Sequence, residues 1–189
     1  MTELVFDEKA HKYTLRGREI PSVTRLLKDA GLIDDRWFSA DGAKRGSYAH
    51  AALEFYDSGD LDESQLDPRL IPYLTAWRKF REQYQPEMLA IEERVFNEAY
   101  WYAGTLDRRV MMQGSEAILD IKTGVPMKHH GVQIALYRMC FPRVTEGMGV
   151  YLSESGYKVV EYHDIDDMSA AKAIVCLAAW KRKYGRGDL

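Results

Sequence analysis

The stretch at residues 117–124, AILDIKTG, constrains the fold more than any other feature of the chain. Its apolar content is that of a buried strand, yet it carries Asp120 and Lys122. Side chains alternate along a strand, so these two charges point to one face while Leu119 and Ile121 point to the other. Burying a charge costs several kcal/mol, to order of magnitude, unless it is paired or binds a metal. The fold must therefore give both charges partners on one face of a core strand.

Composition limits the class of protein. The chain has 189 residues, 46% hydrophobic and 29% charged, which fits one soluble globular domain with a substantial core. Its formal net charge of −3 argues against a protein that coats DNA non-specifically. That charge still permits an enzyme whose acidic cluster is neutralised by metal ions.

The expected location is cytoplasmic, without a membrane segment. No apolar run approaches the roughly 20 residues that span a bilayer, and the start MTELVFD lacks the regions of a signal peptide. The two cysteines, Cys140 and Cys176, lie in apolar helical patterns and are expected to be reduced core thiols. Two cysteines are too few for a four-cysteine iron–sulfur or zinc centre.

Periodicity and turn residues predict a mixed α/β domain. Residues 4–20 indicate a small antiparallel hairpin, and Ser22 should cap a short helix that ends before Gly31. From residue 43 onward the predicted elements are helices at 43–57 and 69–84 (capped by Asp67), strands at 88–96, 100–112 and 116–122, a helix at 129–141, strands at 147–152 and 158–165, and a last helix capped by Asp167. We expect one domain over 1–189, with residues 1–42 or so as an N-terminal elaboration.

A second carboxylate lies upstream in YAGTLDRRV. Gly104 within a strand pattern indicates a bulge or a close approach by another backbone. If strands 100–112 and 116–122 pair through the turn at 113–115, Asp107 and Asp120 meet on one face. Two such carboxylates repel, and one would hold a proton near neutrality unless a cation lies between them. Mg²⁺ suits that position, with Lys122 placed to hold a phosphate oxygen or the attacking water.

Two structural alternatives accompany this interpretation. Asp120 and Lys122 could form a buried ion pair alone, which the nearby Asp107 disfavours. The basic groups at 44–45, 108–109, 128–130 and 181–183 could each be a solvated face.

Two helical patterns and one strand add candidate residues. Gly46, His50 and Glu54 are spaced by four and share one helix face, where an imidazole can join carboxylates around Mg²⁺ or Mn²⁺. A single helical histidine is more often structural. On the strand at 88–96, alternation places Glu93 on the expected inner face and Glu92 on the other.

The helix at 129–141 carries Gln133 and Tyr137 one turn apart, able to contact a base or a phosphate. By themselves they would be interpreted as a polar–aromatic pair at a helix surface.

In order along residues 43–141, these motifs resemble the RecB-type branch of the PD-(D/E)XK nuclease superfamily, which includes bacterial recombination nucleases and phage-encoded exonucleases. The matching motifs are Gly46-x-x-x-His50-x-x-x-Glu54, Gly104-Thr-Leu-Asp107, Asp120-Ile-Lys122 and Gln133-x-x-x-Tyr137. Leu106 stands where the superfamily name has Pro, a position that varies in this branch. The N-terminal HKYTLRGREIPSVTRLL resembles the lead-in of phage-type members more loosely.

The resemblance implies a restriction-endonuclease-like α/β fold, a mixed sheet flanked by helices, and a Mg²⁺ or Mn²⁺ cofactor. It assigns the metal to His50, Asp107, Asp120 and the carbonyl of Ile121, and the attacking water to Lys122. The remaining implied roles are Glu93 and Glu54 as supporting or second-metal acids, and Gln133, Tyr137, Arg45 and Lys128 as DNA contacts.

The function implied by the resemblance is metal-dependent DNA exonuclease activity in phage or bacterial recombination, replication or repair. DNA is the expected partner, together with a single-strand annealing protein or a helicase, in the cytoplasm of a bacterial host if the protein is phage-encoded. A structure-specific or nicking endonuclease, an inactive DNA-binding module, and a hydrolase of another phosphodiester remain as alternatives.

Overall fold

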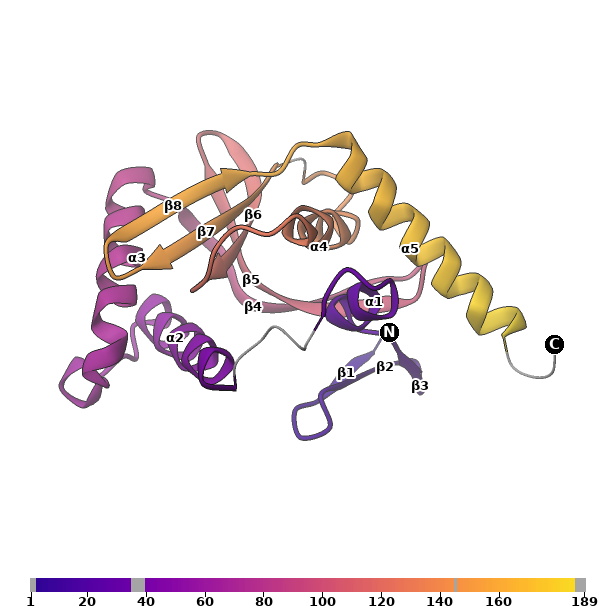
Figure 1. Ribbon diagram of the computed structural model, residues 1–189, viewed down its shortest axis with the longest axis horizontal. Helices are drawn as coiled ribbons and strands as arrows, with labels where there is room; N and C mark the ends of the chain where they lie inside the picture. The colour runs from indigo at the N-terminus through magenta and orange to yellow at the C-terminus, as the bar shows by residue number, and fades with distance from the viewer. Residues whose placement is uncertain (1–2, 35–39, 145, 186–189) are drawn as a thin grey trace.

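A five-stranded mixed sheet forms the centre of the computed structural model, which describes residues 3–34, 40–144 and 146–185 (Figure 1). The strand order is β4-β5-β6-β7-β8, and all neighbours are antiparallel except β6 and β7. Parallel neighbours need a crossover, and a helix supplies it here. The strands are β4 (Glu87–Asn97), β5 (Tyr102–Met112), β6 (Ser115–Lys122), β7 (Glu146–Ser153) and β8 (Gly156–Glu161).

Helices cover both faces of this sheet (Figure 1). Helices α2 and α3 pack in the buried cluster that contains Leu119, whereas α1, α4 and α5 pack in the cluster that contains Ile118. These neighbouring residues of β6 point to opposite faces. The helices are α1 (Val23–Asp29), α2 (Ala40–Ser58), α3 (Ile71–Tyr84), α4 (His129–Arg138) and α5 (Ile165–Tyr184). The predicted α/β order is therefore confirmed.

The N-terminal segment forms a second, smaller sheet. It is antiparallel and consists of β1 (Leu4–Asp7), β2 (Lys12–Leu15) and β3 (Arg18–Ile20). Its buried side chains pack against Ala103 of β5. The predicted cap is also present, because Ser22 Oγ accepts a hydrogen bond of 3.0 Å from the Arg25 N–H.

Several helix boundaries differ from those predicted. Asp67 caps a short 3-10 turn at Pro68–Leu70 before α3 begins. Helix α4 ends at Arg138, three residues before the predicted end at 141. The last helix is capped by Asp164, whose side chain accepts from the Asp166 N–H at 2.8 Å, and not by Asp167. Because Asp164 already starts this helix, β8 ends earlier than the predicted residue 165.

The prediction of two core thiols is wrong for one cysteine. Cys140 is half-buried, and Cys176 is exposed on α5; both are free. Within the described residues, no helix is long and apolar enough to cross a membrane.

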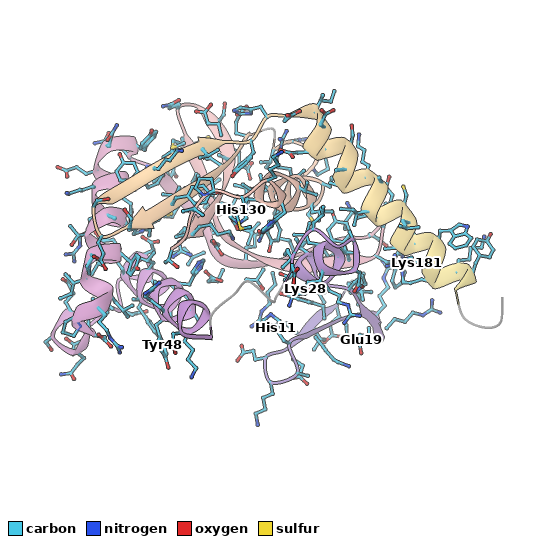
Figure 2. All side chains as sticks on the ribbon, viewed as in Figure 1. His11, Glu19, Lys28, Tyr48, His130 and Lys181 are labelled. Carbon is cyan, nitrogen blue, oxygen red and sulfur yellow. The ribbon has the colours of Figure 1, made fainter. Side chains whose placement is uncertain are left out.

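Two of the basic groups are not solvated faces. Arg108 is completely buried, and His129 and His130 are both buried. Burial, and then repulsion by Lys122, lowers the pKa of both histidines, so they are neutral at physiological pH. His130 lies in the interior (Figure 2), where its Nδ1 is 2.7 Å from the Tyr151 hydroxyl.

Candidate active site

Three side chains from three elements converge beside the central sheet. Atoms of His50 on α2, Glu92 on β4 and Asp107 on β5 all lie within 4.8 Å of one another. His50 Nδ1 is 3.5 Å from Asp107 Oδ1, and all three residues are half-buried. One imidazole nitrogen and two carboxylates form a donor set that suits a divalent cation such as Mg²⁺ or Mn²⁺. The geometry and chemistry of this group therefore fit a metal ion.

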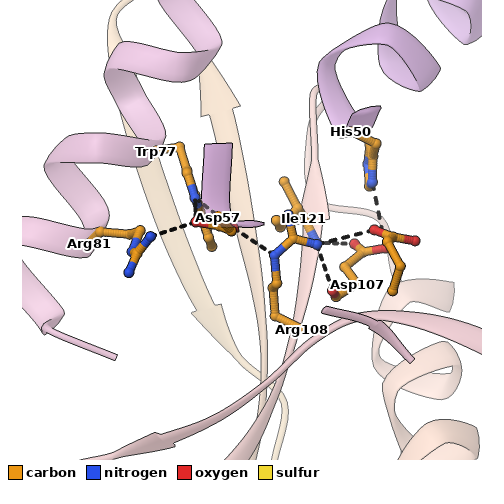
Figure 3. Close-up of polar contacts among 8 residues, drawn as sticks. His50, Asp57, Trp77, Arg81, Asp107, Arg108 and Ile121 are labelled. Atoms are coloured by element: carbon orange, nitrogen blue, oxygen red, sulfur yellow. Dashed lines mark hydrogen bonds and ion pairs between the residues drawn. The ribbon is translucent and has the colours of Figure 1, made fainter. Parts of the chain in front are cut away.

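The end of β6 joins this group through Asp107. The backbone N–H of Ile121 donates a hydrogen bond of 2.6 Å to Asp107 Oδ2 (Figure 3). The last residue pair of the β5–β6 ladder is Arg108↔Leu119, so Ile121 lies just beyond the paired region. The N–H and C=O of one strand residue point to the same side. The carbonyl of Ile121 therefore faces β5 and the Asp107 side.

Asp120 and Lys122 complete the cluster on β6. Lys122 Nζ lies 2.7 Å from Asp120 Oδ2, so the predicted ion pair is present. The pair is not isolated, because the charge of Asp107 raises the pKa of both Asp120 and Lys122. The β5–β6 register, continued one residue past Arg108↔Leu119, sets Asp107 opposite Asp120. The meeting of the two carboxylates that the sequence predicted is thus found beside the ion pair.

Electrostatics within this cluster fix the charge of Lys122. Burial alone would lower the pKa of Lys122, but Asp120 and Asp107 outweigh burial and raise it. Its ammonium is therefore charged at neutral pH. Burial, and then repulsion by Asp107, raises the pKa of Asp120 despite the nearby lysine. Burial also opposes ionisation of Asp107, but His50 and Lys122 prevail and lower its pKa.

Ionisation of Glu92 is also disfavoured in the metal-free site. Burial and the charge of Asp107 raise its pKa to about 7. For His50, burial lowers the pKa and the attraction of Asp107 more than reverses this, so the net direction is upward. Near neutral pH the group thus retains a proton that a bound cation would displace.

The structure corrects the position predicted for the supporting acid. Glu92 lies at the site, whereas Glu93 forms an ion pair of 2.7 Å with Arg109. The prediction assumed regular alternation along β4. That assumption fails at Glu92 itself, whose backbone is left-handed with φ of +49°. Two consecutive glutamates gave no signal to distinguish them.

A cavity of about 470 Å³ adjoins the metal group. Glu54, one helical turn after His50, lines it together with Glu92, and so do Gly104 and Tyr137. A Cβ on Gly104 would lie 2.8 Å from Tyr137 Cε1, closer than side chains allow. The prediction for Gly104 was wrong in kind, because β5 has no bulge there and a side chain, not another backbone, makes the close approach.

The same geometry alters the expectation for the helix pair Gln133 and Tyr137. Tyr137 is only 5% exposed, and its hydroxyl donates to the Thr105 carbonyl at 2.8 Å. The ring is packed inside the protein and is not open for stacking on a base. Arg45 and Lys128, the other predicted DNA contacts, are exposed.

Two buried charges behind the site were missed from the sequence. Arg108 Nη1 lies 3.1 Å from Glu92 Oε1, and Arg108 Nε lies 2.7 Å from Asp57 Oδ2. A signal existed for Asp57, because it follows His50 by seven residues and so shares its helix face. For Arg108 the sequence offered only its position next to Asp107.

No protein-family model and no curated protein sequence matches the chain. Among solved structures, a proposed exonuclease from Eubacterium rectale matches with a TM-score of 0.51 at 10% identity, covering 90% of this chain and 77% of that one. An alkaline exonuclease from Laribacter hongkongensis matches at 12% identity over 87% of this chain and 93% of that one, but its TM-score of 0.41 gives it no weight. The first match confirms the expected nuclease-type fold, a mixed sheet flanked by helices, and at this identity it shows the fold alone.

Proposed function

We propose that this protein is a metal-dependent DNA exonuclease that hydrolyses phosphodiester bonds. The observation that carries the proposal is the convergence of His50, Glu92 and Asp107 within 4.8 Å, beside the Asp120–Lys122 pair. The fold shared with the E. rectale protein adds support. The preference for an exonuclease comes from the order of sequence motifs, which resembles that of phage-encoded exonucleases.

The proposed cofactor is Mg²⁺ or Mn²⁺. His50, Glu92 and Asp107 would hold the ion, with Asp120 and the carbonyl of Ile121 as further oxygen donors. A divalent cation bound there lowers the pKa of coordinated water and neutralises charge on the phosphoryl oxygens. With Asp107 and Asp120 ionised and Lys122 charged, these three side chains carry a net charge of −1, which favours a cation.

Lys122 has a role that follows from its charge. In the metal-free site Asp120 and Asp107 favour the protonated ammonium, so we assign Lys122 the role of a hydrogen-bond donor and not that of the general base. Instead it donates hydrogen bonds, either to a non-bridging phosphate oxygen or to the attacking water. Its positive charge then stabilises the negative charge that develops on the phosphate during in-line attack. Its contact with Asp120 holds the ammonium in place before substrate arrives.

The finer biological assignment rests on the sequence resemblance. We propose that residues 1–189 act as one nuclease domain in phage or bacterial recombination, replication or repair. Arg45 and Lys128, both exposed, are proposed phosphate contacts. A single-strand annealing protein or a helicase is the proposed protein partner.

One assay tests the function. Linear, nicked and covalently closed circular DNA, labelled at either end where ends exist, are incubated with Mg²⁺, with Mn²⁺ or with EDTA. We expect metal-dependent release of nucleotides from the ends of linear DNA, with closed circles intact and Asp120→Asn inactive. Ready cutting of closed circles would favour the endonuclease, and tight DNA binding without cutting would favour the inactive module.

A further inference from the structure

Helix α2 contacts two consecutive residues of β5 with two side chains on one of its faces. His50 contacts Asp107, and Asp57, seven residues later, contacts Arg108 (Figure 3). The first contact belongs to the candidate metal group. The second is buried, since the side chains of Asp57 and Arg108 are 0% and 1% exposed. The helix therefore holds β5 at the site through a second ion pair, Asp57–Arg108, which is buried.

Asp57 is fixed by three donors. Its carboxylate accepts from Trp77 Nε1 at 3.0 Å, from Arg81 Nη1 at 2.7 Å and from Arg108 Nε at 2.7 Å. Trp77 and Arg81 both lie on α3. Asp57 is thus held between two helices, and Arg108 is the one of its partners that leads toward the site (Figure 3).

Arg108 connects this anchor to two residues of the candidate metal group. Its Nη1 donates to the backbone carbonyl of Asp107 at 2.6 Å and to Glu92 Oε1 at 3.1 Å. Glu92 needs such support, because its φ of +49° is a left-handed conformation that costs a bulky residue on the order of 1 kcal/mol or more. Non-glycine residues keep such conformations where the surroundings hold them.

We propose that Arg108, anchored by Asp57, is a positioning residue that holds the Glu92 carboxylate at the candidate metal site. This inference rests on the proposed function for its significance. A role in folding alone fits less well, because buried ion pairs contribute little net stability compared with apolar residues. The planar guanidinium of arginine also suits this arrangement, because its several N–H donors can reach several acceptors at once. A lysine has one ammonium and cannot bridge Asp57, Glu92 and the Asp107 carbonyl in the same way.

A double-mutant cycle on metal binding tests the proposal. Calorimetric Mn²⁺ titration is performed on the wild-type chain, Arg108→Lys, Glu92→Gln and the double variant. Outer residues that orient metal ligands typically change affinity by about 10- to 100-fold, and we expect Arg108→Lys to weaken Mn²⁺ binding by that factor. In the Glu92→Gln background the further loss should be less than about twofold, because Arg108 acts through Glu92. If Arg108→Lys weakens Mn²⁺ binding by the same factor in the wild-type and Glu92→Gln backgrounds, the two residues act independently and the proposal is overturned.

The neighbouring arginine provides a matched control. Arg109 also lies on β5, but it pairs with Glu93 and not with Glu92. Arg109→Lys should keep wild-type Mn²⁺ affinity even where thermal unfolding in EDTA shows lower stability. If it weakens Mn²⁺ binding as much as Arg108→Lys does, the effect is not specific and the proposal fails.

Folding and function are separated by two further measurements. If Arg108→Lys does not fold, Asp57→Asn takes its place in the cycle, and if neither folds the network belongs to folding and the proposal is overturned. DNA cleavage is measured in parallel. A wild-type chain that binds Mn²⁺ but cuts no DNA would defeat the proposed function and leave the cycle to decide on Arg108, whereas one that binds no Mn²⁺ would overturn both.

Discussion

Two glutamate–arginine pairs lie next to each other across β4 and β5, and only one of them belongs to the candidate site. Glu93 and Arg109 form the better ion pair, with two contacts of 2.7 and 3.2 Å, and Arg109 also reaches Glu116 at 2.6 Å. Glu92 and Arg108 share one contact of 3.1 Å. The pair with the poorer geometry is the one beside His50 and Asp107.

The difference lies in the surroundings. The Arg109 side chain is 23% exposed, so its pairs are screened by water and each contributes about 0–1 kcal/mol. The Arg108 side chain is 1% exposed and divides its donors between Asp57, Glu92 and the Asp107 carbonyl. The Glu92 and Glu93 side chains are both 28% exposed, so the burial of the paired arginine and the neighbouring charges distinguish the candidate functional carboxylate from the structural one.

The largest loss of activity is expected when a charged side chain of β6 at the candidate site is removed. Asp120→Asn and Lys122→Ala should each reduce DNA cleavage by about 10²-fold or more, because each removes an electrostatic contact with the transition state. Cleavage of end-labelled linear DNA with Mg²⁺ measures this, and circular dichroism checks that the fold is intact. Near wild-type cleavage by either variant would remove that residue from the site.

A smaller effect is expected for the imidazole. His50→Ala should weaken Mn²⁺ binding by about tenfold, as loss of one ligand or of its support does. The exposed His163, which pairs with Glu146 and Glu161, provides the control, and His163→Ala should bind Mn²⁺ as the wild type does. If His50→Ala lowers the melting temperature with unchanged Mn²⁺ affinity, His50 is a core histidine.

The pH dependence of stability distinguishes the two glutamates. Burial and then Asp107 raise the pKa of Glu92 to about 7 from an ordinary 4.5, so ionised Glu92 destabilises the metal-free fold. Its penalty is absent below pH 4.5 and complete above pH 7, and the free energy of unfolding falls between these values. Glu92→Gln in EDTA should therefore be more stable than wild type by about 2 kcal/mol at pH 8 and equal to it near pH 4.

Urea unfolding at both pH values measures this difference. The same change at Glu93 only breaks a partly exposed ion pair, so Glu93→Gln should lower stability by less than about 1 kcal/mol. If Glu92→Gln is less stable than wild type at pH 8, burial and the charge of Asp107 do not destabilise ionised Glu92.

The smallest effect on DNA binding is expected at Tyr137, which is packed inside the protein. Tyr137→Phe removes the hydrogen bond to the Thr105 carbonyl and should lower stability by about 1 kcal/mol, with DNA affinity unchanged within a few-fold. Thermal unfolding and DNA binding by fluorescence anisotropy measure the two quantities. A large loss of DNA affinity without loss of stability would restore Tyr137 as a DNA contact.

Local chemistry explains what the sequence could predict. The Ser22 cap and the strand carrying Asp120 and Lys122 each follow from a short-range rule, and both are present in the structure. The pairing of β5 with β6 through a tight turn then brings Asp107 to Asp120, as expected. The fold class followed from the order of such elements.

The remaining features depend on backbone geometry and long-range packing. The choice between Glu92 and Glu93 depends on one left-handed residue, which has no signature in two consecutive glutamates. The burial of Arg108 depends on Asp57 and α3, which are distant in sequence. The burial of Tyr137 likewise depends on the neighbouring strand, although its helical spacing with Gln133 was correct.

The most direct test compares the two glutamates in one assay. Rates of nucleotide release from the ends of linear DNA are measured with Mg²⁺ for wild type, Glu92→Gln and Glu93→Gln. We predict a loss of about 10²-fold or more for Glu92→Gln and a rate within about twofold of wild type for Glu93→Gln. The reverse order, or equal rates for all three proteins, would contradict the assignment of the site to the Glu92 side of the sheet.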